Sequence, residues 1–348
     1  MANAKQLEKS SLSDLSKVSA RLGSNPFFVQ AAGGNTSIKE KDTLWIKASG
    51  KHLSDASQTN VFVPVDLAQV HRDIGAGADS YRSLYTNGLR PSIETTLHAL
   101  IPHRVVLHTH PVSVIAQSLI PGSRNHLSAL LKGVSWAWIP YQRPGQPLTR
   151  AIDEVLKTTA SCDVLVLANH GLVVGGDTCE TAEALHHEIC ARLDIKPRPL
   201  ATADRDYLNR ARAAIPHSRL PDNRVTHSLA TDAWSLKLAQ CNPPYPDHVV
   251  FCGTRPLVIR DLDSFAEEAE RFERVWGYKA SYALFPSRGV VLLESASRST
   301  DAMLQAQAEV FLRVSPDSNV SLLTDGQCSE LMNWEAEKYR KSLESVSA

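Results

Sequence analysis

The first part of the chain alternates between helical periodicity and short apolar runs. In residues 5–22 the apolar side chains fall on roughly one face of a helix. Short apolar runs predict strands over residues 44–47, 61–65, 105–107, 136–141, 164–168 and 173–176. Further helices are predicted over residues 93–100, 111–119, 151–160 and 178–193, with a turn or short helix over 66–74. Strands and helices that follow one another in this way predict an α/β fold.

The composition changes at Lys196-Pro-Arg-Pro199, and a proline-rich bend of this kind is typical of a domain boundary. We therefore predict one domain over residues 1–196 and a smaller α/β region over 197–348. Strands are predicted there over residues 248–251, 257–259, 282–285 and 290–293. Helices are predicted over residues 203–214, 263–276, 299–314 and 329–342, and a long turn over 242–247.

One pattern occurs in both parts of the chain. Residues 163–193 read as strand, His170-Gly171, strand, turn and helix, and residues 281–311 read as strand, Arg288-Gly289, strand, turn and helix. The two segments align without a gap, although few residues are identical. We therefore expect the C-terminal region to be a degenerate copy of part of the first domain, with two ordinary strand–turn–helix units as the alternative.

Three histidines and a glutamate stand at the ends of predicted core elements. His108 and His110 follow the apolar run 105–107, and on a strand residues i and i+2 project to the same face. His170 follows the second buried strand, and Glu94 lies in the predicted helix 93–100. Three protein ligands with an open fourth position are typical of catalytic zinc. Histidines next to apolar runs are also often plain core or surface residues, so residue types alone leave both readings open.

Two glycine-containing loops add candidate binding groups. Gly33-Gly34-Asn35-Thr36-Ser37 combines backbone freedom with side-chain donors, and Ser49-Gly50-Lys51 follows the strand 44–47. Taken with Ser92-Ile93-Glu94, His108-Thr109-His110-Pro111 and Asn169-His170-Gly171, these motifs resemble the class II aldolase/adducin family in their order along the chain. The resemblance covers about residues 10–195 and is closest to the longer members of rhamnulose-phosphate aldolase type.

The resemblance implies a three-layer fold with a central, mostly antiparallel sheet between helices. It also implies a divalent ion, Zn²⁺ first, held by His108, His110 and His170, with Glu94 as catalytic acid or base. Three imidazoles also suit Mn²⁺, Fe²⁺ or Co²⁺. The implied reaction is metal-dependent cleavage or formation of a carbon–carbon bond of a ketose or ketose phosphate through an enediolate. Related proteins use this site as epimerases or decarboxylases, and an adducin-like interaction module is the non-catalytic alternative.

In this family the anionic end of the substrate is held by residues that match Asn35, Ser49, Gly50 and Ser92. The sequence departs from the family where simple members often carry a second serine, because Ile93 stands there. Lys51 is a candidate cation that compensates for the missing hydroxyl. His98, one turn after Glu94, could orient it, although a surface position is the commoner place for a helix histidine.

Charge and cysteine content narrow the cellular setting. Lysine plus arginine and aspartate plus glutamate number 37 each, so neither nucleic acid nor an acidic membrane is expected as a partner. The first residues lack the apolar core of a signal peptide, and no apolar stretch is long enough to span a membrane. Six scattered cysteines are typical of free thiols in a reducing cytoplasm. The resemblance adds a homotetramer as the expected assembly.

Overall fold

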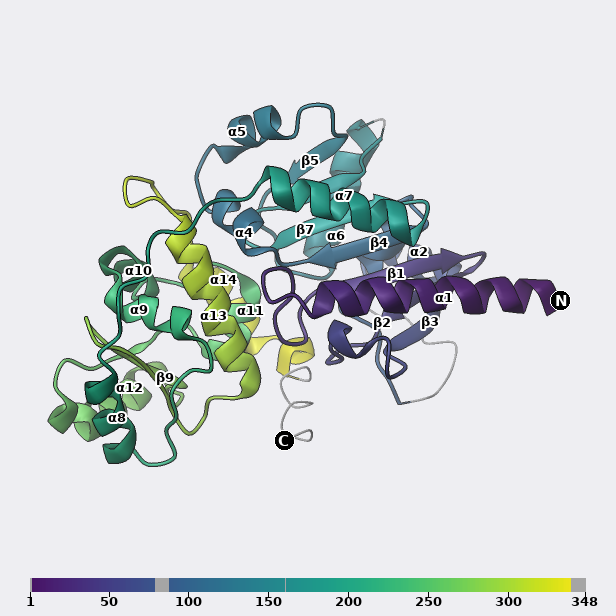
Figure 1. The fold of residues 1–348 in the computed structure, drawn as a ribbon. Coiled ribbons are helices and arrows are strands. Elements are labelled where there is room, and N and C mark those ends of the chain that lie inside the picture. The colour runs from purple at the N-terminus through teal and green to yellow at the C-terminus, as the bar shows by residue number, and fades with distance from the viewer. Residues whose placement is uncertain (1, 79–87, 160, 339–348) are drawn as a thin grey trace. The chain divides into compact units, whose positions relative to one another are not determined.

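The computed structural model describes residues 2–78, 88–159 and 161–338, and Figure 1 shows the course of the chain. The chain divides into two compact units. Unit 1 comprises residues 1–118 and 122–194, and unit 2 comprises residues 119–121 and 195–348. The change at residues 194 and 195 lies close to the predicted boundary at 196. The assignment of catalysis to the first part of the chain stays a prediction at this point.

Unit 1 is built around a seven-stranded sheet with the order β3-β2-β1-β4-β7-β6-β5. Five of its six strand pairings are antiparallel, and the pairing of β5 with β6 is parallel. The predicted mostly antiparallel sheet is therefore confirmed. The strands are β1 (Asn35–Glu40), β2 (Thr43–Lys47), β3 (Phe62–Asp66), β4 (Val105–Thr109), β5 (Trp136–Ile139), β6 (Val164–Leu167) and β7 (Gly171–Gly176).

Helices cover both faces of this sheet, because successive strand residues point to opposite sides. Val105 and Leu107 of β4 pack with α1 and α7 on one face, and Val106 packs with α3 and α6 on the other. The first face is covered by α1 (Ala2–Gly23), α4 (Val112–Ser118), α5 (Ser123–Leu130) and α7 (Cys179–Arg192). The second is covered by α2 (Leu67–Ala76), α3 (Thr95–Leu100) and α6 (Gln146–Thr158). The predicted three-layer α/β architecture is confirmed.

Unit 2 is a smaller α/β structure, as expected, with a three-stranded sheet of order β10-β9-β8. Its strands are β8 (Leu257–Val258), β9 (Tyr282–Phe285) and β10 (Gly289–Leu292). Its helices are α8 (Arg205–Ala214), α9 (Ser228–Thr231), α10 (Ala233–Ala239), α11 (Pro246–Cys252), α12 (Phe265–Trp276), α13 (Arg298–Arg313) and α14 (Asp325–Asn333). Short 3₁₀ turns occur at Leu53–Asp55, Arg224–His227 and Leu262–Ser264.

One prediction in the second half is wrong, and a second differs in its bounds. The run His248–Phe251 is not a strand but part of helix α11, which begins at Pro246. All seven residues of this helix are buried, so its apolar run shows no amphipathic period, and a short run of this kind does not distinguish strand from helix. The predicted helix 329–342 begins earlier, as α14 from Asp325 to Asn333, and residues 335–338 are helical again after a break at Trp334. Positions 339–342 lie outside the described residues.

The repeated pattern predicted from the sequence corresponds to matching topology. Strands β6 and β7 are antiparallel, and β5 lies parallel to β6 beyond helix α6. Strands β9 and β10 are likewise antiparallel, and β8 lies parallel to β9 beyond helix α12. The strand orders β7-β6-β5 and β10-β9-β8 agree as well. Each copy then continues into a helix with a capping box, α7 after Thr178 and α13 after Ser297.

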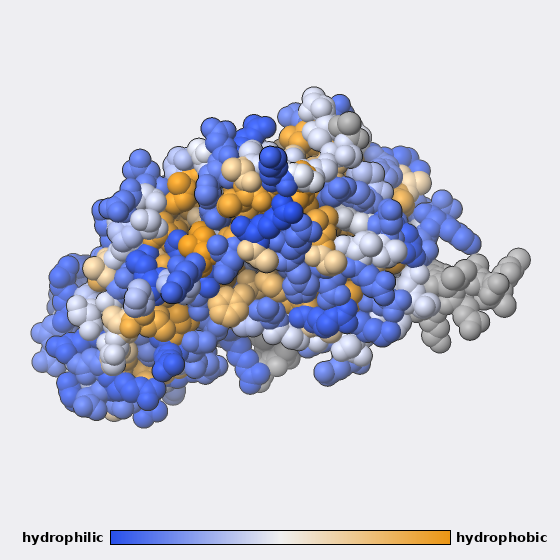
Figure 2. Space-filling model, turned by 45° about the horizontal axis from the view of Figure 1, so that its top comes forward, coloured by the Kyte–Doolittle hydropathy of each residue, from blue (hydrophilic) through white to orange (hydrophobic). Residues whose placement is uncertain are grey.

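Hydrophilic residues cover much of the face shown in Figure 2, with apolar residues showing through in places. The large apolar side chains that the described residues expose are Phe27, Leu200, Val275 and Trp276. Within the described part of the chain, no helix has both the length and the apolar character that a membrane span requires.

Candidate metal centre

Strand β4 carries the first two histidines into the interior of unit 1. It lies between β1 and β7, so His108 is paired on one side with Asn35 and on the other with Val173. The His108 side chain is fully buried, and that of His110, just beyond the strand end, is 4% exposed. Their ring centroids are 4.9 Å apart, as expected for alternate residues on one face of a strand. The intervening Thr109 points to the other face, where its Oγ1 bonds to His186 Nε2 at 2.7 Å.

The turn between β6 and β7 delivers the third histidine. Asn169 adopts a left-handed φ of 52°, a conformation that asparagine tolerates, and this lets the chain reverse within a few residues. His170 then lies with its ring centroid 4.9 Å from that of His108 and 5.2 Å from that of His110. One donor nitrogen from each of the three rings falls within 4.8 Å of the others, and all three side chains are buried. The residues predicted as metal ligands are therefore brought together.

The donor set fits a divalent ion. The carbonyl oxygen of Leu172 can only accept a hydrogen bond, so His108 Nδ1, at 3.0 Å, is a protonated nitrogen and Nε2 is the one left to bind a metal ion. Its Nε2 lies 3.1 Å from His110 Nε2. A backbone carbonyl that fixes the ring in this way is the usual outer contact of a metal-bound histidine. Three buried imidazoles of this kind suit zinc and the neighbouring transition ions equally well.

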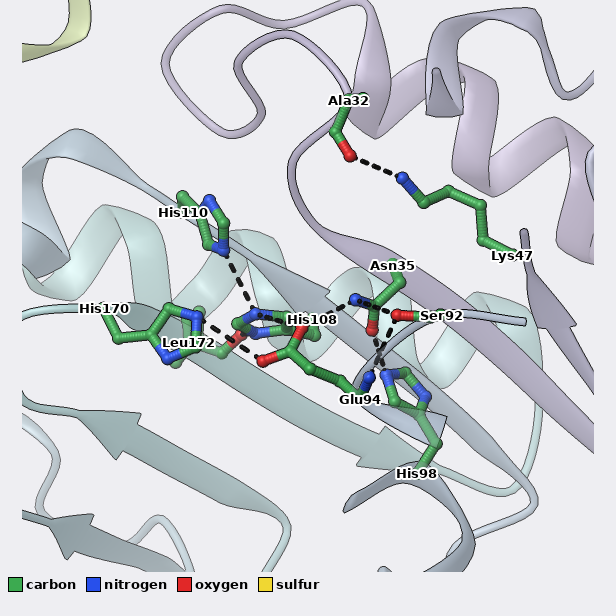
Figure 3. A network of polar contacts seen from close by, with 10 residues as sticks. All are labelled: Ala32, Asn35, Lys47, Ser92, Glu94, His98, His108, His110, His170 and Leu172. Carbon is green, nitrogen blue, oxygen red and sulfur yellow. Dashed lines mark hydrogen bonds and ion pairs between the residues drawn. The ribbon is translucent and has the colours of Figure 1, made fainter. Parts of the chain in front are cut away.

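Glu94 lies against these rings, as Figure 3 shows. Its Oε2 is 3.4 Å from His108 Nε2, and its Oε1 is 3.5 Å from His170 Nε2. Burial acts to raise the pKa of Glu94, but the rings of His108 and His170 and the amide of Asn35 outweigh it and lower this pKa to about 2. The buried Oε1 accepts no hydrogen bond among the described residues. A buried carboxylate held ionised, with one oxygen that accepts no hydrogen bond among the described residues, suits an acid–base group beside a cation.

The helix prediction around Glu94 needs a correction. Helix α3 begins at Thr95, and Glu94 is its N-cap residue rather than part of a helix that starts at Ile93. Ser92 therefore does not open the helix, and its hydroxyl instead accepts from the backbone N–H of Glu94 at 3.2 Å. The turn at residues 92–94 satisfies that donor locally and holds the glutamate side chain toward the sheet.

The residues predicted to hold the anionic end of a substrate line two adjoining segments. The Asn35 amide donates to Ser92 Oγ at 3.1 Å and to Glu94 Oε2 at 2.8 Å. The backbone N–H of Ser49 donates to the carbonyl of Arg90 at 2.8 Å, so the loop that holds Gly50 runs beside the segment that leads to Ser92. Gly50 has a φ of 75°, which explains a glycine at that position. Asn35, Ser92 and Glu94 are thus in contact, and Ser49 and Gly50 are joined to them through the backbone.

Two further residues belong to this network. The Lys47 side chain is 2% exposed, and its Nζ donates to the carbonyls of Ala32 and Lys51 at 2.7 Å each. The buried cation beside the loops is therefore Lys47, whereas Lys51, the predicted candidate, is exposed and contributes its backbone carbonyl. His98 is fully buried against Asn35 and Ser37 rather than on the surface. The sequence signals were a lysine at the end of an apolar strand and a histidine one turn after Glu94.

Comparison with known proteins agrees with this arrangement. The sequence model of the Class II Aldolase and Adducin N-terminal domain matches residues 13–193, which is more than half of the chain. The chain belongs to this family. Class II aldolases use a divalent metal ion, and in this family member His108, His110 and His170 form a group that could hold one.

Two curated relatives match parts of the chain. An uncharacterized oxidoreductase, YuxG, from Bacillus subtilis is 32% identical over 178 residues, which is 46% of this chain and 26% of that protein. Methylthioribulose-1-phosphate dehydratase from Citrobacter koseri is 32% identical over 96 residues, which is 26% of this chain and 40% of that protein. The matches thus span less than half the length of either relative.

Two solved structures are similar to about half of this chain. The N-terminal class II aldolase domain of a conserved Thermoplasma acidophilum protein is 26% identical, with a TM-score of 0.45, over 52% of this chain and 90% of that chain. A sugar-phosphate aldolase from Thermotoga maritima is 15% identical, with a TM-score of 0.43, over 53% of this chain and 93% of that chain.

Proposed function

We propose that this family member is a metal-dependent lyase that cleaves or forms a carbon–carbon bond of a ketose or ketose phosphate. The observation that carries the proposal is the position of Glu94. Its two carboxylate oxygens lie 3.4 and 3.5 Å from ring nitrogens of His108 and His170. An acid–base group directly beside a set of metal ligands is what enolisation next to a carbonyl requires.

His108, His110 and His170 would hold the ion, and Zn²⁺ is our first candidate. When bound, such an ion supplies Lewis-acid stabilisation of the negative charge that develops on the carbonyl and hydroxyl oxygens of an enediolate. The carbonyl of Leu172 keeps the ring of His108 in the tautomer that ligation needs. The burial of all three rings excludes bulk water from the reacting groups.

Glu94 would carry the proton that C–C cleavage releases and that the enediolate takes up. Asn35 donates to its Oε2 and leaves Oε1, which accepts no hydrogen bond among the described residues, as the oxygen that faces the substrate. Asn35, Ser49, Gly50 and Ser92 would hold the anionic end of the substrate. Lys47 would add positive charge near that end. Its Nζ joins the segment before Gly33 to the loop that holds Gly50, through the carbonyls of Ala32 and Lys51.

A second reaction class has a specific observation in its favour. One relative that is 32% identical over 96 residues is named a sugar-phosphate dehydratase. Loss of water from a ketose phosphate also begins with proton removal next to a carbonyl, so Glu94 and the same ligands would serve it. Epimerisation and decarboxylation would share the enolate or enediolate that the same ligands and their ion would stabilise, but not this first step. An adducin-like interaction module without a metal is the non-enzymatic alternative, and the complete ligand set and Glu94 speak against it.

Product analysis of the purified, metal-loaded protein tests this. The screen would contain ketose phosphates, free ketoses and sugar acids. We expect two carbon fragments, an aldehyde and dihydroxyacetone or its phosphate, from one of the ketoses. A single product lighter by one water, an isomer of equal mass or carbon dioxide would replace the lyase by a dehydratase, epimerase or decarboxylase. A protein that contains no stoichiometric metal after purification without chelators would favour the interaction module.

We also propose a compartment and an oligomeric state for the protein. A cytoplasmic, homotetrameric enzyme of carbohydrate metabolism is our expectation, and the six free cysteines support a reducing compartment. Light scattering coupled to gel filtration measures the assembly. A monomer in solution would contradict this part alone and leave the metal chemistry untouched.

A further inference from the structure

His98 is one turn beyond Glu94 in α3, and its side chain is fully buried. The backbone N–H of His98 donates to the carbonyl of Glu94 at 3.2 Å, so the two residues are joined within the first turn. Both ring nitrogens have partners on the neighbouring strand β1. Nδ1 lies 2.7 Å from Ser37 Oγ, and Nε2 contacts Asn35 Oδ1 (Figure 3 draws the contact with Asn35).

The partners fix where the proton on the ring lies. Asn35 presents its Nδ2 to Glu94 Oε2 at 2.8 Å, and a carboxylate accepts only, so the amide oxygen is the atom that faces His98. That oxygen also accepts only, and therefore His98 Nε2 is the protonated nitrogen. Burial lowers the pKa of His98 to about 3, with a smaller effect from His108, so the ring is neutral. Nδ1 then accepts from the hydroxyl of Ser37.

These contacts form one directed chain. Ser37 donates to His98, His98 donates to Asn35, and Asn35 donates to the carboxylate of Glu94. A turned amide of Asn35 would bring its oxygen against the Glu94 carboxylate and its nitrogen against the N–H of His98. Both contacts of that alternative are repulsive, so the histidine selects the productive orientation of the amide.

We infer that His98 is a positioning residue, which acts through Asn35 to hold Glu94 Oε2 and to present Oε1 for proton transfer. This inference rests on the proposed role of Glu94 as proton carrier and names the group that aligns it. Within the described part of the chain, the ring nitrogens of His98 bond to Ser37 and Asn35 and to none of the three site histidines. Its effect on turnover therefore has to pass through the Asn35 amide.

A variant series in the metal-loaded, full-length protein tests the inference. His98→Leu removes the ring N–H, whereas His98→Gln keeps an N–H donor at about the same reach. We expect His98→Leu to lower kcat about 10- to 100-fold, the usual range for a residue that orients a site ligand, with metal content nearly unchanged. His98→Gln should recover most of the lost kcat. Equal loss in both variants, or a loss that appears in metal content instead of kcat, would overturn the inference.

A double-variant cycle with Asn35→Ala separates positioning from a general structural role. If His98 works through Asn35, the double variant His98→Leu with Asn35→Ala turns over no more slowly than Asn35→Ala alone. Losses that multiply would contradict the proposed route.

A crystal structure of metal-loaded His98→Leu adds a measurement that needs no substrate. We expect Asn35 Nδ2 to leave Glu94 Oε2, and an unchanged contact would overturn the inference. This arm stays decisive even if no substrate is turned over, which would count against the proposed function alone.

Discussion

Arg288 forms an ion pair with Asp204 at the place in unit 2 that corresponds to His170 and Glu94 in unit 1. His170 and Arg288 differ by 118 in residue number (288 − 170), and each follows a residue with left-handed φ, Asn169 at 52° and Ser287 at 62°. The two carboxylates are also equivalent, since Glu94 is the N-cap of α3 and Asp204 is the N-cap of α8. The position that His170 and Glu94 have in unit 1 is thus filled in unit 2 by an ion pair.

The correspondence extends through the core. Leu165, Leu167 and Val173 pack together in unit 1, and their counterparts 118 positions later, Ala283, Phe285 and Val291, pack together in unit 2. The bridge Arg219↔Leu292 takes the place of the pair Leu107↔Val174. By that register, Leu220 and Asp222 stand where His108 and His110 stand in unit 1. Unit 2 therefore repeats the frame that carries the histidine triad in unit 1, with Leu220, Asp222 and Arg288 in place of the three imidazoles.

The first prediction is one metal ion per chain. Metal analysis after removal of loosely bound ions should give a ratio near one for the wild type and near zero for His110→Ala. Because His110 lies beyond the end of β4 and the sheet has its own core, this variant should keep its fold, as circular dichroism would show. Arg288→Ala is the matched control in unit 2 and should keep one ion. A ratio near two in the wild type would contradict this prediction, since the described residues hold one such histidine cluster.

The second prediction concerns Glu94. Glu94→Gln keeps the size of the side chain and removes the proton carrier, so kcat should fall by on the order of 10² to 10⁴. The three histidines are untouched, and metal content should stay at the wild-type value. Steady-state kinetics on the substrate found by product analysis provides the measurement. Turnover near the wild-type rate would place proton transfer elsewhere.

The third prediction concerns Lys47. Its buried ammonium joins the carbonyl of Ala32, next to the glycine pair, to the carbonyl of Lys51, just past Gly50. Lys47→Met removes both hydrogen bonds and the charge, so we expect KM for an anionic substrate to rise at least tenfold. Lys51→Met deletes an exposed ammonium and serves as control, with KM within about twofold because exposed charges contribute little. A KM for Lys47→Met as low as that of the Lys51→Met control would show that Lys47 does not contribute to substrate binding.

Much of the fold of unit 1 could be predicted because its strands are short apolar runs and its helices show the helical period of apolar positions. The strand at residues 105–107 and the helix at 178–193 were found where β4 and α7 lie. The segment 248–251 could not be assigned from its pattern, because a fully buried helix shows the same unbroken apolar run as a buried strand. The backbone hydrogen bond between Ser49 and Arg90 could not be predicted either, since it joins two loops far apart in sequence.

The proximity of His108 and His110 could be predicted because alternate residues on a strand project to one face, whereas their grouping with His170 as metal ligands was implied by the family resemblance. The residues around the triad could not be predicted, since their roles depend on burial. His98 looks like an ordinary surface histidine until α3 is packed on β1, and Lys47 looks like a strand-end lysine until the two loops close over it. The exposed Lys51 was the more obvious cation on the sequence alone.

The fourth prediction concerns stability at acid pH. His248 is 2% exposed, lies between the rings of Tyr245 and Tyr282, and has its pKa lowered by burial to about 3. The unfolded chain takes up a proton near pH 6.5, so the neutral ring's contribution is complete above that pH. It is lost as pH falls from about 6.5 toward 3, at about 1.4 kcal/mol per pH unit.

Thermal melts of the wild type and His248→Leu at pH 7 and pH 5 measure this. The variant lacks the titrating group, so its Tm should fall less than the wild-type Tm over this interval. Other buried histidines are common to both proteins and cancel in the difference. Parallel loss of Tm in the two proteins would show that His248 does not bind its proton preferentially in the unfolded state.

The last prediction concerns the contact between β7 and β4 beneath the metal triad. Gly171 approaches so closely that an added Cβ would lie 2.3 Å from the carbonyl oxygen of Thr109 and 3.0 Å from His110 Cδ2. The first of these atoms is backbone, which cannot swing aside as a side chain can. Gly171→Ala therefore forces β7 away from β4 or pushes His110 out of place, and His170 is the adjacent residue in either case. We expect metal affinity to fall at least tenfold, with overpacking costing about 1–3 kcal/mol of stability.

Gly75→Ala in α2 is the matched control, because a Cβ there meets nothing within 4 Å and alanine favours the helix over glycine. Competition of each variant with a chromogenic chelator measures affinity, and a wild-type value for Gly171→Ala would mean that the triad tolerates separation of the two strands.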